Sequence, residues 1–236
     1  MKRISMAILF VSVAVLQAKS QASFGIQGGG LAGSIRAEDN GNSFPGKKSV
    51  FGFKIGAVAS VPIASGVSFM PELNYVSKGG KFSSSKTVDL GILGKVTTDS
   101  KQEYTPSFVE VPLNIAYSTG ANGFFGGLGP VVSLGIGGKA TSDNTVTTVV
   151  NGTSNTSTSK TSSTIKFDGK DNAQDGRVHL KSVELGGNVF AGYRMSNGFF
   201  AKASYNMGFS NLSPVANSSF KTSYFGLSLG YFFSSK

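Results

Sequence analysis

After residue 23 the chain is built from stretches in which apolar residues alternate with small or polar ones. Alternation with a period of two is typical of β-strands, because successive side chains of a strand point to opposite faces of the sheet. Around Lys54, for example, Phe53 and Ile55 belong to the opposite face. Each stretch is about as long as a tilted strand that crosses a bilayer, which needs about 9–11 residues. The predicted strands are 24–35, 50–61, 66–77, 103–117, 123–136, 182–194, 199–208 and 221–233.

Where the alternation is clear, the charged residues all fall on one of the two faces, and the other face carries only apolar and small residues. These parts of the stretches are 51–61, 67–76, 108–117, 183–194, 199–207 and 224–233. A Lys or Arg that faces lipid near the bilayer midplane costs about 2–4 kcal/mol, so a lipid-facing surface excludes such residues. The charged face is otherwise rich in Gly, Ser, Ala and Asn, which suits the interior of a narrow barrel better than the wet face of a soluble β-sandwich. In 24–35 and 123–136 abundant glycine leaves the inward face undecided.

The connections between the stretches alternate in length. Short and long connections therefore lie at opposite ends of the strands, as in outer-membrane barrels with tight periplasmic turns and longer extracellular loops. The predicted fold is an all-β, eight-stranded, antiparallel up-and-down transmembrane β-barrel in the outer membrane of a Gram-negative bacterium, with both termini periplasmic. The short connections are 62–66, 118–122 and 195–198, and the long ones are 36–49, 78–102, 137–181 and 209–220.

The N-terminus is typical of a secretory signal peptide. Lys2 and Arg3 precede an apolar run at 4–16, and small residues follow at Ser20 and Ala22. We predict cleavage after Ala22, which divides the chain into a signal peptide at 1–22 and a barrel domain at 23–236. A membrane anchor is the alternative, but the apolar run is short for a span.

Composition narrows the classes of function. The 236 residues contain no Cys and one histidine, His179. We therefore expect no enzymatic activity, no cofactor and no metal site, since thiolate zinc sites and His-based acid–base catalysis lack their residues. The formal net charge is +10. An exported chain rarely meets nucleic acid, so no nucleic-acid partner is expected and anionic lipid headgroups are the expected counter-charge.

The long connection at 137–181 contains a low-complexity segment, 141–164, rich in Thr, Ser and Asn. Such a composition cannot bury enough apolar surface to fold alone. Two structures are open for it, a flexible cap or a β-ribbon that extends the neighbouring strands. Residues 168–176 contain several Asp and Gly but lack the ligand spacing and terminal Glu of an EF-hand loop, so turn chemistry is predicted there.

Six charged residues are predicted to point into the barrel, three of each sign. A barrel of eight strands is just wide enough for side chains to fill it. Ions buried there have to be paired and hydrogen-bonded, because an unpaired buried charge is costly. We expect a salt-bridged plug without an open pore, and a proton or small-ion path is the alternative. The six residues are Lys54, Glu72, Glu110, Glu184, Arg194 and Lys202.

A second set of basic residues lies at the roots of the long connections, near the expected outer headgroup level. We predict that they contact lipopolysaccharide phosphates electrostatically, and a solvated surface is the alternative. The residues are Lys47, Lys48, Lys78, Lys81, Arg177, Lys181 and Lys221.

Four motifs resemble the PorT-like outer-membrane β-barrel family of Bacteroidetes-type bacteria, in the same order along the chain. PELNYVSKG at 71–79 is similar to its PEL-x-Y-x-x-KG stretch and VEVPL at 109–113 to its LE-(I/V)-PL strand. GLGP at 127–130 and LSLGYFF at 227–233 resemble its G-x-GP strand and its aromatic closing strand. The resemblance implies an eight-stranded outer-membrane barrel and, for the member that names the family, a link to a protein secretion system. The insert at 137–181 departs from the family's pattern.

Three functions compete at this point. A structural or interaction protein of the cell envelope leads, an accessory component of a secretion system follows from the resemblance, and a narrow channel is third. The expected partners are outer-membrane lipid, lipopolysaccharide, and envelope or secretion-system proteins, and the barrel is expected to be monomeric.

Overall fold

The computed structural model of the chain describes residues 22–91, 94–120, 122–171 and 175–233. The predicted signal peptide at 1–22 lies outside these residues, apart from Ala22. The regular elements of the described part are β-strands, as predicted for an all-β fold. No helix in these residues has the length and apolar character needed to span a membrane.

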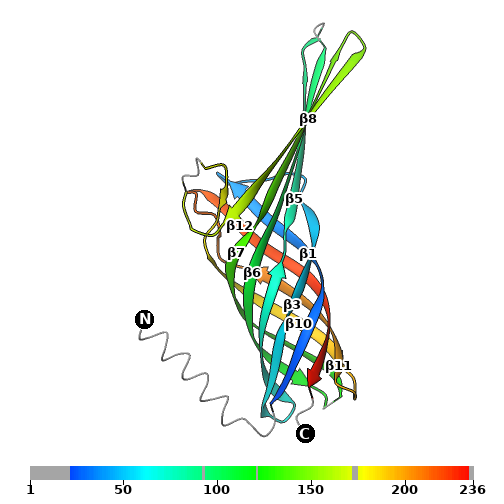
Figure 1. Ribbon diagram of the computed structural model, residues 1–236, viewed down its shortest axis with the longest axis vertical. Coiled ribbons are helices and arrows are strands. Elements are labelled where there is room, and N and C mark those ends of the chain that lie inside the picture. The colour runs from blue at the N-terminus through cyan, green and yellow to red at the C-terminus, as the bar shows by residue number, and fades with distance from the viewer. Residues whose placement is uncertain (1–21, 92–93, 121, 172–174, 234–236) are drawn as a thin grey trace.

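Twelve strands are present in the described residues, where the sequence predicted eight. Eight of them match the predicted stretches and form the body of the molecule (Figure 1). They are β1 (Ser23–Asp39), β3 (Lys48–Ala64), β4 (Val67–Ser77), β6 (Lys95–Ser118), β7 (Gly123–Val150), β10 (Val183–Arg194), β11 (Phe199–Gly208) and β12 (Ser218–Phe233). The four additional strands lie in segments predicted as connections: β2 (Asn42–Ser43), β5 (Gly80–Asp89), β8 (Thr153–Lys166) and β9 (Val178–His179).

Antiparallel pairing joins the eight strands of the body into a closed ring. Each pairs with the next one along the chain, from β1–β3 to β11–β12. β12 then pairs with β1 along its length, from Phe233 opposite Phe24 to Ser218 opposite Asp39. Closure leaves no free sheet edge in the ring, so every strand there has two neighbours to satisfy its backbone groups. We refer to these eight paired strands as the ring.

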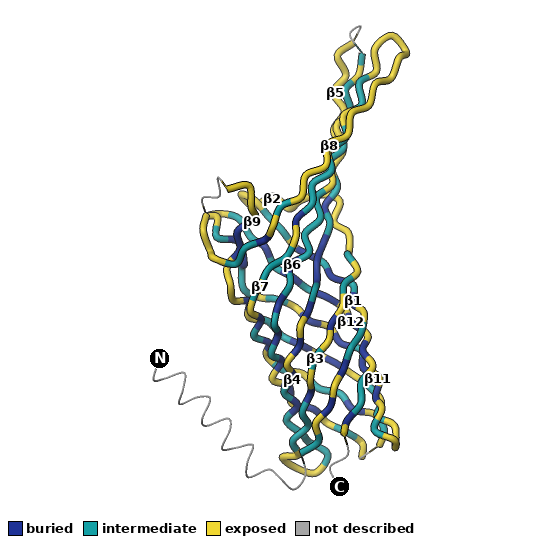
Figure 2. Tube along the Cα trace, viewed as in Figure 1, coloured by how far each residue is buried: buried dark blue, intermediate teal, exposed yellow. Residues whose placement is uncertain are grey.

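Exposed and buried residues alternate along the strands of the ring (Figure 2). Phe51 is 91% exposed, whereas Lys54, on the other face of β3, is 3% exposed. The predicted alternation is therefore present, with the apolar face outward. Exposed apolar side chains from all eight strands include Ile26, Phe51, Ile55, Leu73, Ile115, Leu128, Leu185, Val189, Phe199, Tyr205, Leu227 and Leu229.

The cross-strand register decides which residues of the two glycine-rich strands, β1 and β7, point out of the ring. Residues directly opposite each other in a β-pair point to the same face. Ile26 of β1 lies opposite Tyr231 of β12, and Ile26 is exposed on the outer face. Leu128 of β7 lies opposite Val189 of β10, again on the outer face. In β1, and in β7 as far as Ile136, the even-numbered residues therefore face outward.

A four-stranded antiparallel sheet projects from one end of the ring (Figure 1). It consists of β5, the first part of β6, the last part of β7 and β8, in that order. We refer to it as the projecting sheet. Of the two structures that the sequence left open for 141–164, the segment forms the β-ribbon and not the flexible cap. The short connections between β3 and β4, β6 and β7, and β10 and β11 lie at the opposite end of the ring.

Local chemistry explains why a Ser/Thr-rich segment forms strands. Thr side chains pair across β7 and β8, with Thr145 and Thr158 hydroxyls 3.2 Å apart and those of Thr147 and Thr156 3.3 Å apart. Such cross-strand pairs stabilise a sheet. Between β7 and β8, Asn151 and Gly152 have φ values of 48° and 80°, the left-handed conformation that two-residue hairpin turns require at both positions.

Candidate functional site

Two hydrogen-bonded charge networks occupy the interior of the ring. The first is centred on Glu72, from β4, which is 3% exposed. Its carboxylate accepts hydrogen bonds from Lys202 Nζ at 2.5 Å and Gln27 Nε2 at 2.6 Å. The side-chain amides of Asn74 and Asn114 donate to the same carboxylate at 3.1 and 3.3 Å. Four donors from four strands thus satisfy one buried anion.

Lys54, from β3, is buried near Glu72 and Lys202. Among the described residues its ammonium forms no ion pair within 4.0 Å. It adds a second positive charge to the first network without a direct carboxylate partner.

The second network lies closer to the projecting sheet and is centred on Lys78. Its Nζ donates to Glu110 Oε1 and Glu184 Oε2, both at 2.8 Å. The Tyr224 hydroxyl donates to the other oxygen of Glu110 at 2.8 Å. The Thr222 hydroxyl donates to Glu184 at 2.8 Å. One buried ammonium is therefore shared by two carboxylates, and each carboxylate has a further donor.

A row of asparagines extends the first network across the interior. Asn206 Nδ2 donates to Asn188 Oδ1 at 3.1 Å, and Asn188 Nδ2 donates to Asn114 Oδ1 at 2.9 Å. Asn114 in turn donates to Glu72. The row connects β11, β10, β6 and β4 through side chains.

Apolar layers lie at both ends of the charged interior. At the end with the short turns, the layer consists of Val58, Met70, Ala116, Phe125, Phe190, Phe200 and Phe232. At the end with the long loops, it consists of Ile35, Phe82, Phe108, Ala140, Ile165, Leu180, Leu212 and Phe220. Between the layers, the described interior contains three Lys (Lys54, Lys78, Lys202) and three Glu (Glu72, Glu110, Glu184).

Two of the predicted positions need correction. Arg194 was predicted to lie in the interior network, but it is only half-buried near the short turns, with its guanidinium carbon 4.5 Å from the centroid of the Phe232 ring. Lys78 was predicted at the lipid headgroup level, but its side chain is 4% exposed inside the ring. Lys78 continues the inward series of Glu72, Asn74 and Val76, and a prediction that followed this period one residue past Ser77 would have found it.

The other predicted headgroup contacts lie at the loop end of the ring or just beyond it. Lys47, Lys48, Arg177 and Lys181 are exposed, while Lys81 and Lys221 are half-buried. Lys81 Nζ lies 3.4 Å from a carboxylate oxygen of Glu103, so part of its charge is compensated within the chain.

A third polar cluster, which sequence reasoning missed, fixes the loop between β8 and β10. His179 Nδ1 lies 2.7 Å from Asp168 Oδ1, and its Nε2 lies 3.0 Å from Asp175 Oδ1. The two aspartates also accept the backbone N–H groups of Lys170 and Arg177, which is the turn chemistry predicted for this segment. We refer to His179, Asp168 and Asp175 as the histidine clamp.

The hydrogen bonds of the histidine clamp favour its charged form. The bonds to Asp175 and Asp168 raise the pKa of His179 above its ordinary value. The bond from His179 lowers the pKa of Asp168 and of Asp175. An imidazolium has two N–H donors, whereas a neutral imidazole has one, so only the charged ring satisfies both carboxylates. Within the described residues, no group of three or more His, Asp or Glu side chains is arranged to hold a metal ion.

Comparison with known proteins gives a family and distant structural neighbours. The chain is similar to Ail, the attachment invasion locus protein of Yersinia pestis, with 13% identity over 90% of this chain and 99% of that chain and a TM-score of 0.37. It is similar to Neisserial surface protein A, with 13% identity over 91% and 100% and a TM-score of 0.34. It is also similar to OprG from Pseudomonas aeruginosa, with 14% identity over 91% and 97% and a TM-score of 0.33. No curated protein matches the chain.

The family match covers most of the sequence. Residues 16–213 match the family described as outer membrane protein beta-barrel domain. This chain therefore belongs to the outer membrane protein β-barrel domain family.

Proposed function

We propose that the protein is an eight-stranded transmembrane β-barrel whose projecting sheet binds proteins at the outer surface of the bacterium. The observation that carries the proposal is the projecting sheet itself, which extends well beyond the ring and has two open edges (Figure 1). The ring anchors this sheet in the outer membrane, and the interior networks make the anchor rigid.

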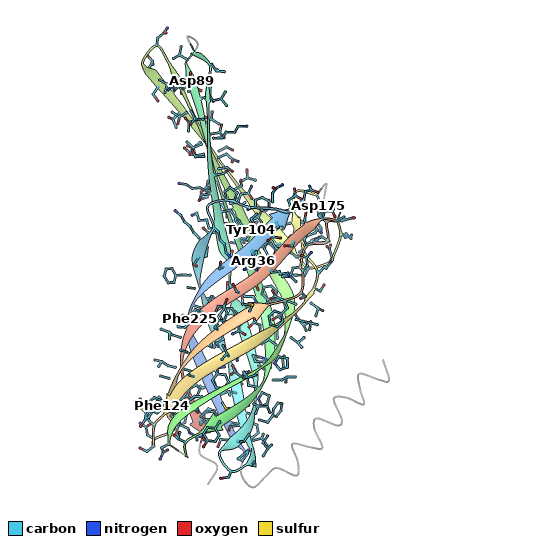
Figure 3. All side chains as sticks on the ribbon, turned by 180° about the vertical axis from the view of Figure 1, so that it is seen from behind. Arg36, Asp89, Tyr104, Phe124, Asp175 and Phe225 are labelled. Carbon is cyan, nitrogen blue, oxygen red and sulfur yellow. The ribbon has the colours of Figure 1, made fainter. Side chains whose placement is uncertain are left out.

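The outer face of the ring supports the membrane assignment. Away from the loop end, its exposed side chains are apolar or small on all eight strands, as hydrocarbon contact requires. The short turns and the C-terminal strand end are then periplasmic, and the long loops and the projecting sheet are extracellular. Figure 3 shows Phe124 near the turn end and Asp89 near the tip of the sheet, at opposite ends of the molecule.

The filled interior favours an anchor over a channel. The two apolar layers close both ends of the ring interior, and the buried Lys and Glu residues between them balance in sign. The cavity beside Lys78, Glu110 and Glu184 measures about 10 Å³. That is about the space of one water molecule, so a continuous file of water does not fit there.

The open edge of β8 is the proposed contact. Its residues from Thr153 to Thr164 pair with β7 on one side only, and parallel pairing with β9 begins at Ile165. An unpaired edge presents a row of N–H and C=O groups to which an extended polypeptide segment can add as a further strand. The exposed Ser and Thr side chains of β8 keep this edge soluble when it is unoccupied.

The test uses a shortened protein and site-specific cross-linking. In the shortened variant, residues 144–159 are replaced by Asn-Gly, which joins the remaining parts of β7 and β8. A photo-cross-linking amino acid is placed at Ser162, an exposed residue of β8 that both proteins retain, and, as the control, at Ile63 beside a periplasmic turn. We expect cross-links to extracellular protein from position 162 in the full-length protein and their loss in the shortened variant. An unchanged set of surface partners after shortening would contradict the proposal.

Further expectations belong to the same proposal. The mature protein starts at Ser23, is a monomer, and its exposed basic residues contact lipopolysaccharide phosphates. Association with lipopolysaccharide should weaken when Lys47, Lys48 and Lys181 are all changed to Gln. The role in a secretion system rests on the PorT-like resemblance alone, and recovery of secretion components with the position-63 cross-linker would favour it.

A further inference from the structure

A pocket of about 390 Å³ lies at the loop end of the ring. Ligand pockets in proteins measure about 300–1,000 Å³. Its walls come from the end of β1, the residue after β2, the bases of β5 and β6, and the loops that precede β10 and β12. Tyr104 and Asp175, both near this end, are labelled in Figure 3. We refer to it as the loop-end pocket.

Aromatic side chains form one wall of the loop-end pocket. The ring centroids of Phe44 and Phe82 are 5.5 Å apart, those of Phe82 and Tyr104 6.2 Å, and those of Tyr104 and Phe220 5.8 Å. Phe82 and Phe220 belong to the apolar layer at the end of the ring with the long loops, whereas Phe44 is 42% exposed at the pocket's edge. The wall therefore combines a fixed aromatic base with one accessible ring.

The charges that line the pocket are mainly negative, on a chain whose net charge is +10. Three carboxylates line it, Glu38, Asp39 and Asp171, against one ammonium, Lys170. Asp39 accepts a hydrogen bond from the Ser218 hydroxyl at 2.7 Å and keeps its second oxygen for another donor.

His179 also lines the pocket but does not change this balance. Both of its ring nitrogens face aspartates, Asp168 and Asp175, whose charges offset that of the imidazolium. The histidine clamp instead holds the segment that forms this side of the pocket.

We propose that the loop-end pocket binds a small organic cation, an ammonium group carried on an aromatic or branched aliphatic body. Aromatic rings attract cations and also provide apolar contact for the body of the ligand. The carboxylates favour a positive charge over a neutral or negative one. A bare metal ion fits less well, because no group of three or more ligating side chains is arranged for one among the described residues. The proposal does not depend on strand addition at β8, which lies outside the pocket.

The experiment compares three probes that share a phenyl ring and differ in charge. They are 2-phenylethylammonium, 2-phenylethanol and 3-phenylpropionate, each titrated calorimetrically into the full mature protein in zwitterionic micelles. We expect the ammonium to bind about fivefold or more tightly than the alcohol, which corresponds to about 1 kcal/mol, and the carboxylate to bind most weakly.

Variants of residues that line the loop-end pocket distinguish binding in the pocket from adsorption of the probes to the micelle. Combining Glu38→Gln with Asp171→Asn should reduce the affinity for the ammonium about fivefold and leave the affinity for the alcohol unchanged. Phe44→Ala should weaken both, and Asp143→Asn on the projecting sheet, the matched control, should weaken neither. The alcohol also reports whether the pocket is still formed in each variant. The proposal would be overturned by equal binding of the three probes or by no binding of the ammonium. It would also be overturned by an unchanged ammonium affinity in the Glu38→Gln, Asp171→Asn variant.

Discussion

At the scale of single residues, the histidine clamp shows how a lone histidine gains a structural role. His179 is buried and has a carboxylate on each ring nitrogen. Its pKa is raised above 6.5, so its stabilising contribution is complete below pH 6.5 and is lost as the pH rises through the raised pKa. The pKa values of Asp168 and Asp175 are lowered from 3.8, so their contribution is complete above pH 3.8 and is lost as the pH falls through the lowered values. The clamp is therefore strongest between about pH 3.8 and 6.5.

This leads to a titration experiment with one unambiguous signal, because the chain has a single histidine. The imidazole resonance of His179, followed by NMR, should titrate with a midpoint above 6.5. Asp175→Asn should lower that midpoint, since it removes the partner with the largest effect on the pKa. Asp143→Asn, far away on the projecting sheet, should not. A midpoint at or below 6.5 in the unmodified protein would rule out the clamp.

A second prediction at this scale concerns the buried carboxylate of Glu72. Glu72→Ala leaves Lys202 without its ion-pair partner, and breaking a buried pair in this way costs about 3–5 kcal/mol. The free energy of unfolding in urea should fall accordingly, while planar-bilayer conductance stays at its baseline. Glu103→Ala is the matched control, because the half-exposed pair with Lys81 contributes only about 0–1 kcal/mol. A large gain in conductance in the Glu72 variant would count against a plugged interior.

At the scale of elements, the projecting sheet owes its form to turns and to cross-strand pairs and not to a core. Its strands β5 and β8 are largely exposed. The two-residue turn at Asn151 and Gly152 sets the register of β7 with β8, because its backbone twist matches that of the strands. Register then brings Thr145 opposite Thr158 and Thr147 opposite Thr156.

Altering this turn should loosen the hairpin and nothing else. Replacing Asn151 and Gly152 by Ala-Ala places alanine in the left-handed region at both positions, which costs an alanine about 1–2 kcal/mol. Glycine has no Cβ to clash there, and asparagine adopts this conformation more readily than alanine. Amide hydrogen exchange should become faster in β8 and in the end of β7, and stay unchanged in the ring. Replacing Ser154 by Ala, next to the turn, is the control that should preserve protection. Equal protection in all three proteins would show that the turn does not set the hairpin.

At the scale of the whole molecule, the two faces of the ring differ in the polarity of their side chains. Apolar side chains face outward and the balanced charges face inward, the reverse of a soluble protein. An environment of hydrocarbon accounts for both faces at once. A folded protein that stayed soluble and monomeric without detergent would be incompatible with this organisation.

A charge on the outer face tests this organisation directly. Leu227, near the middle of β12, is 60% exposed on the outer face. Leu227→Lys should cost about 2–4 kcal/mol in a bilayer and reduce the fraction of protein that folds into lipid vesicles. Val149→Lys, an apolar residue of the projecting sheet, should leave that fraction unchanged. Equal folding of both variants would mean that the outer face does not contact hydrocarbon.

The sequence by itself determined the features that depend on period and on connection length. The outward apolar face, the burial of Glu72, Glu110 and Glu184, and the segregation of short turns from long loops follow from local patterns, because a strand alternates its side chains whatever its neighbours are. The PorT-like resemblance and the signal peptide stay predictions.

Only the tertiary structure decided the features that depend on which strands meet. The facing of β1 and β7 comes from register with their neighbours, and the sharing of Lys78 between Glu110 and Glu184 joins residues far apart in the chain. The position of Arg194 outside the charge networks has the same origin, since ring closure sets where the interior ends. The projecting sheet, the histidine clamp and the loop-end pocket likewise form from connections whose local sequence does not specify a structure, because their pairing partners are supplied by distant segments.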